Sequence, residues 1–157
     1  MSPEKTKILN NMKLGIVSLE HIPAANCKSW GFIDRNGSVD VSLFKTGEFT
    51  TLDFTELMCS FQEEWIDGPN GKHSEISIAG TIRTRKKSAS KAVLKVLLSN
   101  NYIYRITAAS GEKLLIGSID FLPKVTFKNI IEGLTTSEYQ FSISLKSTSG
   151  AITDTSV

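Results

Sequence analysis

The segment from Ser74 to Phe127 constrains the fold most, because several secondary-structure signals follow one another within it. Residues 74–83 and 102–106 alternate between apolar and polar side chains, which is typical of strands with one buried face. Between them, a serine that can cap a helix opens residues 88–99, whose apolar residues form one helical stripe. A Ser-Gly turn then leads into residues 114–121, another predicted strand. This order predicts a β-rich unit that carries one short helix.

The rest of the chain supplies further strands. Residues 138–145 show the cleanest alternation, with Tyr139 and the next three odd-numbered residues, all apolar, on one face. Residues 39–43 and 59–66 are also predicted strands, and residues 67–73 form a turn-rich loop at the tip of a long hairpin. We therefore expect a mainly β, antiparallel fold, either a β-sandwich or an open β-barrel, with one short α-helix near residues 88–99.

A chain of 157 residues is typical of one domain. Residues 1–11 are polar and are expected to form a flexible N-terminal arm. Residues 12–146 are expected to form the single mainly-β domain, although residues 13–22 do not alternate cleanly before the chain reaches Pro23. Residues 147–157 are polar and rich in serine and threonine, so we expect a disordered C-terminal tail.

Charge and apolar runs limit the partners of the chain. A net charge of +2 is too small to indicate a dedicated nucleic-acid or membrane binder. No run approaches the roughly 20 apolar residues of a membrane span. Translation from Met12 would begin like a lipoprotein signal, but Glu20 and His21 interrupt its apolar run, so we expect no signal peptide and no membrane partner.

The side chains that most often carry chemistry are scattered. Cys27 and Cys59 lack metal-ligand spacing and are expected to be reduced and packed, with a disulfide as the alternative. His21 and His73 have no nameable third partner, and the acidic group Glu63-Glu64 with Asp67 is expected to be solvated. We therefore predict no catalytic residue, no metal site and no cofactor, and we expect that the protein is not an enzyme.

One basic cluster stands out. It contains six cations within thirteen residues, at the end of one predicted strand and along the predicted helix: Arg83, Arg85, Lys86, Lys87, Lys91 and Lys95. No aromatic residue is interleaved to stack on nucleic-acid bases. The cluster is either a solvated loop that also meets acidic groups of a neighbouring subunit, or a phosphate-binding patch at the start of the helix.

From about residue 49 to 147 the order of elements resembles the tail-tube and tail-adaptor subunits of tailed bacteriophages and related prophages. The matching stretches are Gly80–Arg83, the short helix, Tyr102–Ile106, Leu114–Gly117 and Tyr139–Ser142. These residues shape a fold and carry no functional signature, and the first 48 residues lie outside the resemblance, so they do not indicate the type of virion part.

This resemblance implies a structural, non-enzymatic virion subunit of the tail that self-assembles into a ring or tube. Its partners would be further copies of itself and other virion proteins, and it would be made in the host cytoplasm and located in the virion. The hairpin 59–83 and the helix 88–99 would be the assembly surfaces. The alternative is a small nucleic-acid-binding module that uses the basic cluster between residues 83 and 95.

Overall fold

The structure of the 157-residue chain is a computed structural model. The structure describes residues 7–30, 37–51, 58–69, 71–83, 95, 99–132, 136–147 and 150–156. Two 3-10 turns, η1 (Ala24–Asn26) and η2 (Val41–Leu43), and ten strands lie in these ranges. The strands are β1 (Lys7–Pro23), β2 (Ser38–Val39), β3 (Thr50–Thr51), β4 (Met58–Gly68), β5 (Gly71–Arg83), β6 (Tyr102–Ala108), β7 (Lys113–Ile116), β8 (Lys124–Glu132), β9 (Thr136–Ser147) and β10 (Ile152–Asp154).

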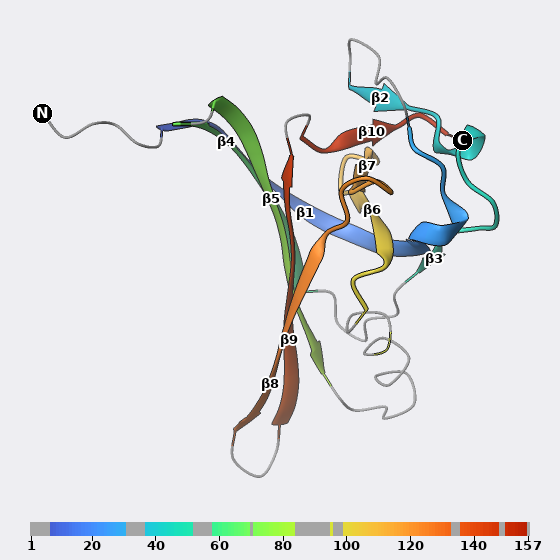
Figure 1. The fold of residues 1–157 in the computed structure, drawn as a ribbon. Helices are drawn as coiled ribbons and strands as arrows, with labels where there is room; N and C mark the ends of the chain where they lie inside the picture. The colour runs from blue at the N-terminus through green and yellow to red at the C-terminus, as the bar shows by residue number, and fades with distance from the viewer. Residues whose placement is uncertain are drawn as a thin grey trace, which may run out of the picture.

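The strands form two sheets that share β1 (Figure 1). The long sheet has the order β1-β4-β5-β9-β8, and the short sheet has the order β2-β10-β7-β6-β1, with β3 also paired to β1. All pairs are antiparallel except β2 with β10. The predicted mainly β, antiparallel fold is confirmed, and its two packed sheets make it like a sandwich.

Strand β1 passes from one sheet to the other at a bulge. Its first half, up to Gly15, pairs with β4, and its second half, from Ile16, pairs with β6. The register shifts between Ile16 and Ser18, so Val17 is an extra residue, and its side chain is 56% exposed. This bulge explains why the sequence of this strand does not alternate cleanly.

The main core lies between the two sheets. The long sheet contributes one face of its central strands, including Phe61, Ile78 and Ile143, all fully buried. The short sheet contributes Tyr104 and Ile106 of β6, at every second position. Burial of each such side chain contributes about 1.5–3 kcal/mol before conformational entropy is counted.

A second core lies on the other face of the short sheet. Ile103 and Leu115 point away from the main core, because adjacent residues of a strand face opposite sides. The segment from η1 to β3 covers them with Trp30, Val41 and other apolar side chains. Trp30 therefore anchors this segment, and the short sheet is covered on both faces.

The structure corrects several predicted boundaries. The hairpin β4–β5 continues in register to Gly68 and Gly71, so its tip is short and most of residues 67–73 belong to the strands. β7 ends at Ile116, because Gly117 adopts a φ of +94° that strands do not use. Of residues 39–43, only Val39 lies in a strand, and η2 follows.

The predicted ends of the domain also differ from the structure. Residues 7–11, assigned to a flexible arm, begin β1, and residues 152–154, assigned to a disordered tail, form β10. Most of the predicted helix 88–99 lies outside the described residues. Within that range, Lys95 is described and has helical geometry.

Candidate assembly surface

The structure describes only two members of the predicted basic cluster. Arg83 is the last residue of β5 and pairs with Glu138 of β9 along the backbone, and Lys95 is exposed. Arg85, Lys86, Lys87 and Lys91 lie outside the described residues. The proximity of the six cations therefore stays a prediction.

The β4–β5 hairpin occupies the middle of the long sheet. β4 pairs with β1 on its other side, and β5 pairs with β9, so neither strand offers an open edge along these pairings. Along these pairings, the tip and the outer face of the hairpin remain for contacts. The long sheet ends on one side at the first half of β1, which pairs there only with β4, and on the other side at β8, whose described residues pair only with β9. Sequence reasoning missed these edges, because pairing order is not readable from one chain.

The acidic group on β4 does not behave as one solvated patch. Glu63 is 8% exposed and accepts hydrogen bonds from the Ser74 hydroxyl and the Ala151 backbone amide, each at 3.2 Å. Its neighbour Glu64 accepts a hydrogen bond from Gln62 on the opposite face. The prediction of solvated charge was wrong for Glu63, which ties the chain before β10 to the long sheet. Glu63 lies two residues after the buried Phe61, so both side chains face the same side of β4. This spacing was the signal in the sequence that Glu63 is buried.

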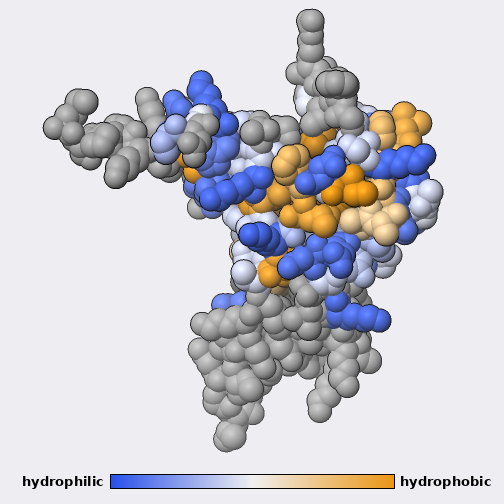
Figure 2. All heavy atoms as spheres, viewed as in Figure 1, coloured by the Kyte–Doolittle hydropathy of each residue, from blue (hydrophilic) through white to orange (hydrophobic). Residues whose placement is uncertain are grey.

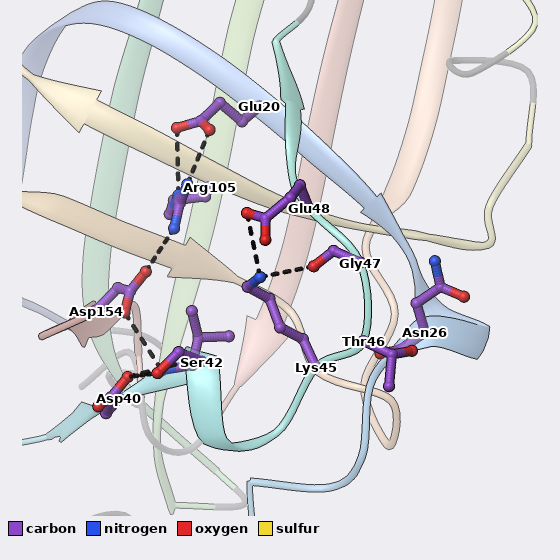
Figure 3. A network of polar contacts seen from close by, with 11 residues as sticks. Glu20, Asn26, Asp40, Ser42, Lys45, Thr46, Gly47, Glu48, Arg105 and Asp154 are labelled. Carbon is purple, nitrogen blue, oxygen red and sulfur yellow. Dashed lines mark hydrogen bonds and ion pairs between the residues drawn. The ribbon is translucent and has the colours of Figure 1, made fainter. Parts of the chain in front are cut away.

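A partly buried ion triad joins three strands of the short sheet (Figure 3). Arg105 donates two hydrogen bonds to Glu20, at 3.2 and 2.8 Å, and one to Asp154, at 2.8 Å. Its guanidinium carbon lies 4.0 Å from the centre of the Phe49 ring, a cation–π contact. The Asp154 side chain is fully buried, and it also accepts hydrogen bonds from the backbone amides of Val41 and Ser156.

These contacts shift the pKa values of Asp154 and Arg105. Burial alone would raise the pKa of Asp154, but hydrogen bonds from Ser156, Arg105 and Val41 outweigh it and hold the pKa below 3.8. Burial alone would lower the pKa of Arg105, but its hydrogen bonds and charge interactions with Glu20 and Asp154 raise it. Arg105 and Asp154 are therefore both charged near neutral pH, and their ion pair holds β10 against β6.

An open cavity of about 490 Å³ lies between the long sheet and the segment that precedes β8. β8 begins at Lys124 opposite Ser144, so the last residues of β9 extend beyond it. The lining mixes apolar side chains with both signs of charge: Gln62, Glu64, Glu75, Ile76, Ser77, Phe121, Leu122, Lys124, Ser144, Leu145 and Lys146. Glu75 lies 3.4 Å from Nε2 of His73, within hydrogen-bonding distance, and forms an ion pair with Lys146 at 3.6 Å.

A braced turn forms one rim of this cavity. The backbone amides of Ser118 and Phe121 donate to each other's carbonyl oxygens, at 3.0 and 3.2 Å. Asp120 accepts a 2.8 Å hydrogen bond from Ser29. The turn thus holds Phe121 with 63% of its surface exposed. Figure 2 shows apolar side chains gathered on the face of the molecule where the segment before β8 lies, flanked by hydrophilic ones.

The remaining chemistry-bearing side chains serve as packing groups. His21 packs edge-on against Tyr102, with ring centres 5.2 Å apart, and burial lowers its pKa. Cys27 is a free, buried thiol whose pKa is raised by burial. In the part of the chain that the structure describes, no group of three or more His, Cys, Asp or Glu residues could hold a metal ion. Within the same residues, no helix is long and apolar enough to cross a bilayer.

No family model, curated protein or solved structure matches the chain.

Proposed function

We propose that this chain is a structural, non-enzymatic subunit of a tailed-phage or prophage virion, part of the tail, that self-assembles into a ring or tube. The resemblance of residues 49–147 to tail-tube and tail-adaptor subunits motivates this proposal. Its partners would be copies of itself and other virion proteins.

The observation that best supports self-assembly is the combination of an open strand edge and exposed apolar side chains. β8 lacks a second neighbour among the described strands, and open edges readily pair with other chains. Phe121, three residues before that edge, is exposed although its turn is braced by hydrogen bonds. Because the backbone of this turn is already held by hydrogen bonds, it loses little conformational entropy on binding, which favours association.

Self-assembly is tested by the mass in solution, measured by light scattering over a range of protein concentrations in low and high salt. Discrete rings or growing tubes would support the proposal, and electron microscopy would then show their form. A chain that stays monomeric throughout contradicts self-assembly by this chain alone.

The basic cluster carries the second candidate function, a nucleic-acid-binding module. Reversing the charges of Arg85, Lys86 and Lys87 separates the two functions. Under the first, association weakens while the monomer stays folded. Under the second, DNA or RNA binding is lost, and binding of the unmodified chain falls with salt at a slope set by the number of phosphates contacted.

A further inference from the structure

The β10 segment, residues 150–156, occupies a slot that is built from parts of the chain distant in sequence. Its strand pairs with β7 on one side and with β2 on the other, and Figure 1 shows it beside both. The side chain of Ile152 is 6% exposed and packs in the second core. The slot therefore binds this sequence along both edges of an extended strand and through one buried apolar side chain.

Polar groups of the slot fit the segment closely. Arg105 binds the fully buried Asp154 carboxylate at 2.8 Å, and Glu63 accepts a 3.2 Å hydrogen bond from the Ala151 backbone amide. If the segment left, Arg105 would lose one of its two carboxylates, and the carboxylate of Glu63, which is 8% exposed, would lose that amide. Buried polar groups that lose a partner cost free energy, so the folded chain needs an occupant in this slot.

The connection from β9 to the β10 segment is short and constrained. β9 ends at Ser147 in the long sheet, and β10 begins at Ile152 in the short sheet. Between them, Gly150 has a φ of +74°, and a Cβ at this position would meet the carboxylate of Glu63, so the backbone has little room. Short hinge loops under constraint favour exchange of the element that follows them between identical chains.

We infer that copies of this chain exchange the β10 segment, so that residues 150–156 of one copy fill the slot of another copy. This inference rests on the proposed self-assembly and names the element that joins the subunits. The occupant is one whose fit the structure shows, because this same sequence lies in this slot. Mutual exchange joins two copies symmetrically, whereas donation from each copy to the next continues around a ring or along a tube.

Two single-cysteine variants, Ser38→Cys on β2 and Thr153→Cys on β10, detect the exchange. These residues are paired on neighbouring strands, which lie about 4.7–4.9 Å apart, a separation that a disulfide can span. One variant carries an affinity tag, and the two are incubated together and then oxidised. Neither chain holds both introduced cysteines, so they can meet in the slot only when one copy has donated its segment to the other. We expect a linked pair on a denaturing gel.

The matched control mixes Thr153→Cys with Val17→Cys. Val17 is 56% exposed, but it lies on β1, which β6 and β7 separate from β10 in the short sheet. This mixture measures disulfides that arise from collisions or from the native cysteines. Groups held together in one site have an effective concentration of about 1 mM, so at micromolar protein the control pair should form at least about tenfold more slowly.

A chain that carries both Ser38→Cys and Thr153→Cys tests whether assembly needs the exchange. Oxidation of the dilute monomer fixes the segment in its own slot through an internal disulfide. The oxidised chain should lose the assemblies that light scattering detects, and reduction should restore them. Under reducing conditions the variant should melt at about the temperature of the unmodified chain, because both positions are only partly buried.

The outcomes separate this inference from the proposed function. If the unmodified chain assembles but the oxidised double variant assembles equally well, or the mixed variants link no faster than the control, the exchange is wrong and self-assembly stands. If linked pairs form but the unmodified chain never grows beyond two copies, the exchange stands and the ring or tube fails. If the unmodified chain stays monomeric and the mixed variants link no faster than the control, both fail.

Discussion

Replacement of Arg105 by leucine tests how far the ion triad stabilises the short sheet. The substitution leaves the fully buried Asp154 carboxylate and the 15% exposed Glu20 carboxylate without their cation. Breaking a buried pair by removal of one partner typically costs about 3–5 kcal/mol. A domain of this size melts about 2–4 °C lower for each kcal/mol lost, so we expect a decrease of about 6–20 °C.

Urea unfolding followed by tryptophan fluorescence measures this cost, and an unchanged slope would show that the unfolded state is unaffected. The matched control is Glu48→Gln, which breaks the 3.4 Å ion pair to Lys45. Because Glu48 is 92% exposed, this pair should contribute at most about 1 kcal/mol.

A double variant identifies the cause. If an unpaired buried charge is responsible, Arg105→Leu combined with Asp154→Leu should be more stable than Arg105→Leu alone, because no buried carboxylate then remains at position 154. A loss below about 1 kcal/mol in the single variant, or simple additivity in the double variant, would refute the reasoning.

Three further predictions concern a glycine and two titrations. Gly150→Ala should lower the urea midpoint of unfolding more than Gly37→Ala. Both glycines have a positive φ, +74° and +67°, but of these two positions only 150 would bring an added Cβ against another side chain, and the nearest is that of Glu63. The backbone strain of a positive φ, common to both variants, costs about 1–3 kcal/mol. Equal urea midpoints of the two variants would rule out an added steric cost at position 150. Since the folded pKa of Asp154 lies below 3.8, its stabilisation is present above that pH and is lost as the pH falls through the folded pKa; Asp154→Asn should flatten this acid limb in pH-dependent melts. Burial raises the pKa of Tyr104 above its usual 10, so its stabilisation is complete below pH 10 and is lost as the pH rises towards the folded value. Tyr104→Phe should remove this alkaline loss, and an unchanged alkaline limb would contradict it.

The sequence predicts best where one face of a strand is buried and the other is solvated. Phe141 and Ile143 of β9 are buried while Ser144 is exposed, so period-two alternation identified this strand. Alternation fails in β1, because its second half is covered on both faces and the bulge at Val17 shifts the pattern by one residue.

The sequence predicts least where order comes from partners distant in the chain. β10 has only three residues and a polar composition, and it is held by pairing with β7 and by the ion pair of Asp154 with Arg105, 49 residues earlier. Composition alone therefore indicated disorder. Likewise, the cavity beside β9 is lined from four strands and one turn, whose proximity depends on a pairing order that no local pattern encodes.

The passage of β1 through both sheets has a consequence for folding. Its two halves pair with β4 and β6, which begin at Met58 and Tyr102, so both sheets depend on contacts that are long-range in sequence. Such contacts slow folding, because a long loop must close before each one forms. These contacts also join the two sheets into one cooperative unit. Detachment of β1 would at the same time open the edge of the long sheet and expose the main core.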